Sequence, residues 1–158
     1  MAISKIGTNS IDTITSISFA ASQTAVADAN TLDDYEQGTF TATPRGGDAG
    51  SGAYTKIGNL VTFTIIVSSI GSTSNSNEMN VSGLPFTSAN NSIDASVTIG
   101  TQYQVDLGDT GALRAKVGAN GTSIYFYETR DDNTYVIPTQ AAFDHADAFL
   151  LLSGSYLL

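Results

Sequence analysis

The chain has 158 residues and a net charge of −9, because 15 acidic residues outnumber six lysines and arginines. This acidity excludes nucleic acid and anionic membranes as main partners, since binding phosphates requires clustered Lys and Arg. Cysteine is absent, which excludes disulfides and thiolate metal sites. No apolar run approaches the roughly 18 residues of a membrane span. The abundance of Ser, Thr, Asn and Gly favours short β-strands over a helical bundle.

Residues 1–30 form a first region, in which isolated apolar residues stand among Ser, Thr, Ala and Asn. Their spacing follows neither a heptad nor the alternation of a strand, so the segment cannot bury much surface by itself. We interpret it as an extended N-terminal arm that docks on another protein, with a floppy terminus as the alternative. The residues expected to anchor it are Ile3, Ile6, Ile11, Ile14, Ile17 and Phe19.

Residues 31–158 predict a single β-module, whose first clear element is a hairpin around Gly58-Asn59. Two-residue turns suit residues that tolerate positive φ. Closing this turn pairs residue 57 with 60 and residue 54 with 63, and alternation then gives each strand an apolar and a polar face. The apolar face comprises Tyr54, Val61, Phe63, Ile65 and Val67, and the polar face Thr55, Thr62 and Thr64. The pattern predicts a strand buried on one side.

The other strands are predicted from shorter or less regular patterns. They are expected at 40–43, ended by Pro44, at 60–70 as the longest, and at 78–81, 93–100, 103–107 and 135–137. Gly-rich or polar loops are expected at 45–52, 71–77 and 131–133. Residues 141–147 are expected to form one helical turn.

A second hairpin is centred on Asn120-Gly121, a dipeptide typical of two-residue turns in which both residues have positive φ. Closing it pairs residues 115 and 117 with 126 and 124 on an apolar face. On the other face it places cations opposite aromatic rings, which suits an exposed sheet surface. The sequence therefore predicts an exposed recognition surface made of Tyr125, Tyr127, Arg114 and Lys116. Tyr103 is a further candidate for stacking on sugars, with ordinary sheet packing or a subunit interface as the alternative.

The segment from Phe149 to Leu158 is apolar on both faces, which predicts a central strand covered on both sides. A lone sandwich buries one face and would leave the other as an apolar patch in water. We therefore expect a closed symmetric oligomer with its contact at or near this strand. The residues expected at that interface are Leu150, Leu152, Tyr156 and Leu158.

Catalytic or metal-binding chemistry has little support in the sequence. His145 has no Gly-x-Ser-x-Gly nucleophile motif to serve and no thiols with which to share a metal, so it is interpreted as a loop residue. Asp33, Asp34 and Glu36 could mimic a glycosidase pair, and Asp131-Asp132-Asn133 could offer oxygen ligands to calcium. The favoured interpretation of the first set is a solvated cluster of carboxylates, and that of the second is a simple turn. Neither a cofactor nor a metal is therefore expected.

Several of these stretches resemble a β-rich module of bacteriophage tail-fibre and other virion proteins. The most specific is Leu32-Asp33-Asp34-Tyr35-Glu36-Gln37-Gly38-Thr39-Phe40-Thr41, followed by Tyr54-Thr55-Lys56-Ile57-Gly58-Asn59-Leu60-Val61-Thr62. Weaker matches follow the family's order at 17–23, where Ala20 replaces the usual proline, and at 83–88 and 149–156. The resemblance covers residues 17–158 and implies a non-enzymatic, trimeric virion component.

Pattern and resemblance together predict an all-β fold, an antiparallel β-sandwich of jelly-roll type that carries the N-terminal arm. The expected function is that of a non-enzymatic virion structural protein, made in the host cytoplasm because the N-terminus lacks the apolar core of a signal peptide. The expected partners are other copies of the chain, other virion proteins and host surface glycans.

Two positions on the particle stay open. One is a tail or head fibre used for host attachment, and the other is a capsid decoration (cement) protein whose arm laces neighbouring capsid subunits. The chain has no shaft repeat or coiled coil, which moves the interpretation towards the decoration protein. Tens of copies per particle would indicate a fibre and hundreds a decoration. A polysaccharide depolymerase is the enzymatic alternative.

Overall fold

The computed structural model describes residues 35–70, 76–107, 111–130 and 133–158, which form nine strands and one short 3-10 helix. The strands are β1 (Tyr35–Pro44), β2 (Gly50–Ile57), β3 (Leu60–Ser68), β4 (Asn80–Ser82), β5 (Ala95–Tyr103), β6 (Ala112–Val117), β7 (Ser123–Arg130), β8 (Asn133–Val136) and β9 (Phe149–Leu157). The 3-10 helix η1 spans Gln140–Phe143. The predicted arm, with Ile3, Ile6, Ile11, Ile14, Ile17 and Phe19, lies outside the described residues.

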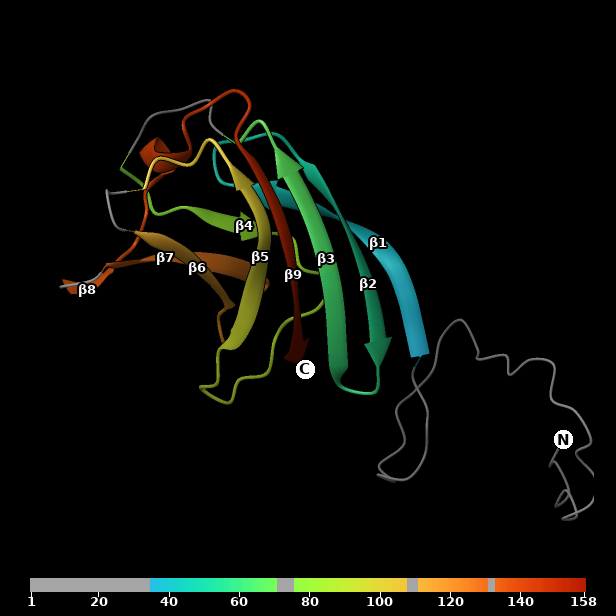
Figure 1. The fold of residues 1–158 in the computed structure, drawn as a ribbon. Coiled ribbons are helices and arrows are strands. Elements are labelled where there is room, and N and C mark those ends of the chain that lie inside the picture. Colours follow the sequence, from blue (N-terminus) through green and yellow to red (C-terminus); the bar gives the residue numbers. More distant parts are fainter. Residues whose placement is uncertain (1–34, 71–75, 108–110, 131–132) are drawn as a thin grey trace, which may run out of the picture.

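All strand pairings are antiparallel, and the strands form one sheet in the order β4-β1-β2-β3-β9-β5-β6-β7-β8. Strand β4 pairs with β7 as well as with β1, so the sheet folds back and its two halves face each other. Figure 1 shows β1, β2, β3, β9 and β5 side by side, with β4, β6 and β7 in the other half. The predicted all-β, antiparallel class is confirmed, and the strand order is compatible with a jelly roll without establishing one.

One hydrophobic core lies between the two halves of the sheet. Phe63 of β3 packs against Tyr156 of β9 with ring centroids 6.0 Å apart, and Phe126 of β7 packs against Phe143 of η1 at 5.7 Å. The helical turn expected near residue 141 is therefore present, and it supplies a core aromatic ring. Full burial of each such side chain contributes roughly 1.5–3 kcal/mol. Within the described residues there is no helix with the length and apolarity required to cross a bilayer.

The hairpin around Gly58 has the predicted register, with residues 57 and 54 opposite residues 60 and 63. Gly58 has φ +58°, as the turn requires. Along β3, buried and exposed residues alternate without exception. The same register places Lys56 on the inner side, where it is 7% exposed and its Nζ lies 5.7 Å from the centroid of the Phe86 ring. The sequence pattern did not indicate this buried cation, which a cation–π contact stabilises.

The second hairpin has the predicted pairing at every position, but its turn differs in one respect. Asn120 has φ +54°, whereas Gly121 is not among the residues with positive φ. The Gly121 N–H donates to Ser88 Oγ at 3.1 Å, and the Gly121 carbonyl accepts from the Ser88 N–H at 2.9 Å. The prediction of positive φ at Gly121 is therefore wrong, because a contact from a distant loop fixes the turn.

That loop, residues 83–89, closes one end of the core and ties the two halves of the sheet together. The Gly83 N–H donates to the Thr122 carbonyl at 3.1 Å, and the Tyr156 hydroxyl donates to the Phe86 carbonyl at 3.0 Å. Burial raises the pKa of Tyr156 to about 12. Gly83 has φ +101°, and a Cβ at this position would lie 2.2 Å from the Thr41 carbonyl oxygen. Only glycine fits there.

Several predicted boundaries shift because pairing between strands, which local pattern does not report, determines where each strand begins and ends. The strand expected at 93–100 lies at 95–103 as β5, which pairs with β9 across an irregularity between Ile99 and Thr101, and of the strand expected at 103–107 only Tyr103 is in a strand. Strand β1 is longer than β3, at ten residues against nine, since its pairing with β2 begins at Tyr35. Strand β2 begins at Gly50, inside the expected loop, and the short strand predicted at 78–81 lies at 80–82.

Strand β9 is central, as predicted, with β3 on one side and β5 on the other. The residues predicted to form a subunit interface lie on the inner side of this strand and not on its exposed side. Leu150, Leu152 and Tyr156 are at most 2% exposed and belong to the core, and Leu158 packs partly against it. The choice of these residues as a subunit interface is therefore corrected, because the inner side of β9 is already filled by the chain's own core. The outward side chains are Phe149, Leu151 and Leu157.

Candidate binding surface

A groove of about 420 Å³ lies on the outward side of β6 and β7. Strand alternation directs the even-numbered residues of β6 and the odd-numbered residues of β7 to this side. Neighbouring segments before and within β5, together with β8, complete the walls. The lining residues are Asp94, Ser96, Arg114, Ala115, Lys116, Tyr127, Thr129 and Tyr135.

Two aromatic rings form one wall of the groove. Tyr127 and Tyr135 meet edge to face, with ring centroids 5.1 Å apart and an interplanar angle of 78°. Tyr135 is 57% exposed, so part of its ring is open to a ligand. The Lys116 Nζ lies 4.8 Å from the centroid of the Tyr127 ring and covers that ring from another side. Aromatic rings in this setting offer apolar area to a ligand while the phenol hydroxyls offer hydrogen bonds.

An ion pair lies beside the aromatic wall. Lys116 Nζ is 2.5 Å from Asp94 Oδ2, and Asp94 Oδ1 accepts from the Ala119 N–H at 3.2 Å. The hydrogen bond from Lys116 lowers the pKa of Asp94. The hydrogen bond to Asp94, with a smaller contribution from Tyr127, raises the pKa of Lys116 to about 12. Both groups are therefore charged across the neutral range, and water screens their attraction because both side chains are about one third or more exposed.

The groove brings together three of the four residues expected to form a recognition surface: Arg114, Lys116 and Tyr127. Tyr125, the fourth, lies beside it, packed close enough to the turn that a Cβ at Gly118 would lie 3.0 Å from its ring. Tyr103, the further candidate, is 58% exposed at the far end of β5, opposite Phe149. It does not line the groove.

Sequence reasoning missed five of the eight lining residues. Ala115 and Thr129 belong to the hairpin of β6 and β7, and the other three, Asp94, Ser96 and Tyr135, lie outside it. Ser96 reaches the groove because β5 pairs with β6, which places it opposite Lys116, and Asp94 precedes the same strand. Tyr135 reaches it because β8 pairs with β7. Tyr135 alone had a local signal, as an aromatic residue in a predicted short strand. The other two depend on a pairing between strands that local pattern does not specify.

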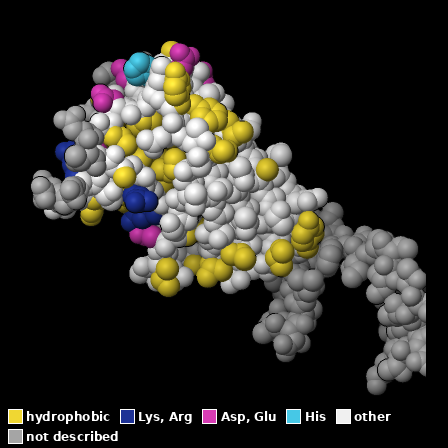
Figure 2. Space-filling view, viewed as in Figure 1, with side chains coloured by type: hydrophobic (Ala, Val, Ile, Leu, Met, Phe, Trp, Pro, Cys, Tyr) yellow, Lys and Arg dark blue, Asp and Glu magenta, His cyan; other side chains and the backbone are white. Residues whose placement is uncertain are grey.

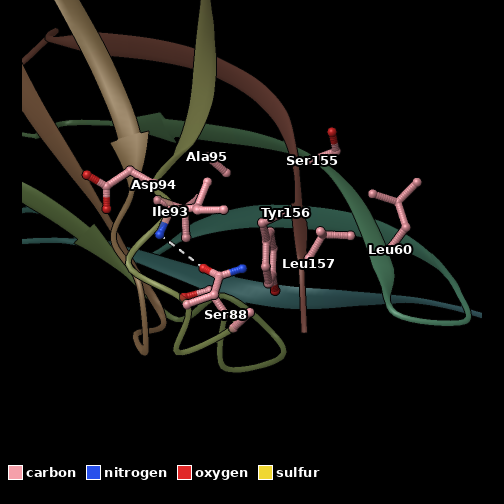
Figure 3. Close-up of a pocket in the computed structure, with 11 residues that line it drawn as sticks. Leu60, Ser88, Ile93, Asp94, Ala95, Ser155, Tyr156 and Leu157 are labelled. Atoms are coloured by element: carbon pink, nitrogen blue, oxygen red, sulfur yellow. Dashed lines mark hydrogen bonds between the residues drawn. The ribbon is translucent and has the colours of Figure 1, made fainter.

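A second, more enclosed pocket of about 200 Å³ lies between the end of β9, the start of β3 and residues 88–95. Figure 3 shows Leu60, Leu157 and Ile93 around it, with the Tyr156 ring standing between. The Ile93 N–H donates to the Asn91 side-chain oxygen at 3.0 Å. The lining residues include one carboxylate and neither a cation nor a histidine. This pocket suits a small apolar group and offers no acid–base pair.

The other residues considered for chemistry are placed as follows. His145 is exposed in the turn after η1, where its N–H donates to the Phe143 carbonyl at 2.7 Å. Glu36 accepts from the Tyr54 hydroxyl at 2.5 Å, and this bond raises the pKa of Tyr54. Glu36 is thus in a structural contact and not only part of a solvated cluster. The remaining carboxylates named above lie outside the described residues: Asp33, Asp34, Asp131 and Asp132.

The arrangement suits binding better than catalysis. Exposed aromatic area, hydroxyls and fixed charges of both signs are the groups that hold a polar, ring-bearing ligand such as a carbohydrate. Glycoside hydrolysis requires two carboxyl groups that flank the bond to be cut. The groove lining contains a single carboxylate, Asp94, which is already paired with Lys116. Among the described residues, no three His, Cys, Asp or Glu side chains gather as a metal site.

Comparison with known protein families finds none that matches the chain, and no curated protein is significantly similar in sequence. A solved structure does match: the crystal structure of Dettilon tailspike protein (gp208), with a TM-score of 0.65 at 19% sequence identity. The match covers 77% of this chain and 23% of that protein, so the chain spans less than a quarter of the tailspike's length. The two share a fold over the matched region.

Proposed function

We propose that this chain is a structural component of a bacteriophage virion. The observation that carries the proposal is the fold shared with a phage tailspike protein over most of the chain. The sequence resemblance to tail-fibre modules, which rests on the motifs in β1 and in the first hairpin, supports the same conclusion. The two arguments are of different kinds, because one compares local residues and the other compares the path of the backbone.

Host attachment is the role we propose for the outward-facing module. The groove on β6 and β7 supports it, because an open aromatic ring beside Arg114 and Lys116 suits a host surface glycan. The function is non-enzymatic in this proposal, since the groove supplies one paired carboxylate where glycan cleavage needs two. The module is attached as a homotrimer through the arm of residues 1–30.

A capsid decoration protein is the alternative. In this alternative, the isolated apolar residues of the arm lace neighbouring capsid subunits. Both alternatives place the module on the outside of the virion, and both use the arm as an anchor. They differ in the number of copies per particle and in the structure to which the arm binds.

Labelling purified particles with an antibody against this chain tests the proposal and separates its two forms. A fibre gives label at the tail or at isolated head sites with tens of copies, and a decoration gives label over the whole head with hundreds. Absence of the chain from purified particles would refute both. Cleavage of host polysaccharide by the purified protein would refute the non-enzymatic part.

The anchoring role of the arm has its own test. Deleting residues 1–30 should leave the β-module folded, because its hairpins and core lie downstream. The same deletion should remove the protein from particles. Truncated protein found on virions at the normal copy number would show that the arm is not the anchor.

A further inference from the structure

The outward side of strands β1, β2, β3, β9 and β5 forms one broad surface, which we call the five-strand face. Its residues follow from alternation along each strand and are mostly Ser and Thr with some apolar side chains. They are Tyr35, Gln37, Thr39, Thr41, Thr43, Ser51, Ala53, Thr55, Ile57, Leu60, Thr62, Thr64, Ile66, Ser68, Ser96, Thr98, Thr101, Tyr103, Phe149, Leu151, Ser153, Ser155 and Leu157. Not one of these described positions carries a charge.

The absence of charge from this face is unexpected for a chain with a net charge of −9. The solvated side of an antiparallel sheet ordinarily carries charged residues, which keep it soluble and discourage pairing with other proteins. Figure 2 shows the acidic and basic side chains of this view gathered at the top and left of the molecule. Depletion of charge is the compositional mark of the centre of a protein–protein interface.

The register arranges the face in rows that cross the strands. The central row runs Thr39, Ala53, Thr64, Ser153, Thr98 and contains only small side chains. Rows toward the two ends contain the large apolar residues. One end row consists of Tyr35, Ile57, Leu60 and Leu157, each 38–47% exposed. Toward the other end, Ile66, which is 49% exposed, pairs with Leu151.

We propose that the five-strand face packs against further copies of this chain and is the surface that joins the subunits of the oligomer. This inference deepens the proposed function by naming its subunit interface. Two acidic chains repel each other, so they associate most easily through surfaces that carry no acid. Hydroxyl groups both donate and accept hydrogen bonds, so a Ser- and Thr-rich face can satisfy a copy of itself, which a face of carboxylates cannot.

The area of the five-strand face is close to the area that an interface with another copy of the chain requires. Five strands about 4.8 Å apart and about nine residues long, at roughly 3.4 Å per residue, span about 700 Å². A standard protein–protein interface takes about 800 Å² from each partner. Small side chains in the central row let backbones approach closely. The apolar rows on either side supply the burial that hydroxyl groups alone do not.

The test compares oligomeric mass for two lysine substitutions in the full-length chain. Thr64→Lys places a charge in the central row, and Thr122→Lys places the same charge on an exposed residue away from the face. Wild-type protein in light scattering coupled to size exclusion should have at least twice the mass of one 16.4 kDa chain. Thr64→Lys should weaken association on the order of 100-fold or more, because the charge is buried unpaired. Thr122→Lys should leave the mass unchanged.

The far-UV circular dichroism spectrum of Thr64→Lys should match that of wild type, which shows that the variant is folded. Leu157→Lys, at the apolar end of the face, should lower the oligomeric mass in the same way. A monomeric wild-type chain would overturn the inference, as would an oligomeric Thr64→Lys or an equal effect of Thr122→Lys. A monomer whose Thr64→Lys form no longer joins particles would show that another virion protein covers the face. None of these results depends on antibody labelling of particles, so the virion assignment stands or falls separately.

Discussion

The two outward surfaces of the folded sheet differ sharply, although one continuous sheet forms both. The five-strand face has hydroxyl and apolar side chains and no charge at its described strand positions. The outward side of β6 and β7 carries Arg114, Lys116 and the Tyr127–Tyr135 pair, with Asp94 beside them. The chain has few cations, and it places two of its six on this second surface.

The difference follows from our proposal that the five-strand face packs against other copies of the chain while the surface of β6 and β7 stays in water. A surface that contacts copies of itself is expected to exclude fixed charge. Each charge would either lie close to a like charge on the other copy or be removed from water without a partner, and both are unfavourable. A surface that stays in water tolerates charge at little cost and can use it to orient a ligand. We therefore expect substitutions on the two surfaces, and on the core side between them, to have different readouts.

The largest effect is expected from the inner side of β9. Leu152 is 0% exposed, so Leu152→Asp buries an unpaired carboxylate and should cost several kcal/mol, enough to unfold a domain of ordinary stability. Leu157 is 47% exposed on the outer side, so Leu157→Asp should yield folded protein that fails to oligomerise. Urea unfolding and light scattering distinguish the two outcomes.

The matched pair sharpens the comparison because both changes replace leucine by aspartate in one strand. A folded, monomeric Leu152→Asp protein would return the interface to the inner side of β9 and contradict the burial described above. Unfolding of both variants would mean that the outer side also belongs to a core.

The next largest effect is expected in the loop of residues 83–89, which ties the two halves of the sheet together by hydrogen bonds. Gly83→Ala requires a side chain at φ +101° and places Cβ 2.2 Å from the Thr41 oxygen, so it should cost at least about 2 kcal/mol. Gly58→Ala is the control, since Gly58 has φ +58° but nothing within 4 Å of a Cβ, and about 1 kcal/mol is expected. Denaturant midpoints compare them, and equal costs would show that the loop does not constrain the sheet.

Local pattern was sufficient to predict the class of the fold and both hairpins. Turn residues and alternation determine pairing between neighbours in sequence, so the registers around Gly58 and Asn120 could be read directly. Pairings between distant segments could not be read in this way. The connection of β4 to both β1 and β7, and of β9 to both β3 and β5, depends on the packed core.

The same limit applies to the candidate site and to the interface. The cations and the aromatic residue of one hairpin were predicted to share a side, and they do. Asp94 and Tyr135 reach the groove through the pairings of β5 with β6 and of β8 with β7, which no turn motif in the sequence specifies. For β9, alternation divided the apolar residues correctly into two sides. Nothing local could decide which side faced the core, because both are apolar, and the interface was predicted on the side that the core fills.

A smaller effect is expected in the turn at the end of the groove hairpin. Asn120 has φ +54°, so Asn120→Val should cost about 1–2 kcal/mol through backbone strain. Gly121 is not in the positive-φ region, and a Cβ there would lie 3.6 Å from the nearest atom, an ordinary contact. Gly121→Ala should therefore be close to neutral. Thermal unfolding measures both, and a larger cost at Gly121 would contradict the observed turn.

The smallest effect is expected from the ion pair of the charged surface. The pKa of Asp94 is lowered in the folded state, so the stability from this pair is present above the unfolded pKa of about 3.9 and is lost as pH falls through the folded value. The pKa of Lys116 is raised to about 12, so the same stability is lost only when pH rises from about 10.4 through that value. The side chains are 33% and 40% exposed, and screening by water keeps the contribution below about 1 kcal/mol.

Asp94→Asn keeps an oxygen for the Ala119 N–H and removes only the charge, so its difference from wild type in urea unfolding should vanish at acidic pH and shrink at high salt. A difference that persists unchanged at low pH would mean that Asp94 acts through its packing, and the charged surface would then lose its one fixed pair of opposite charges.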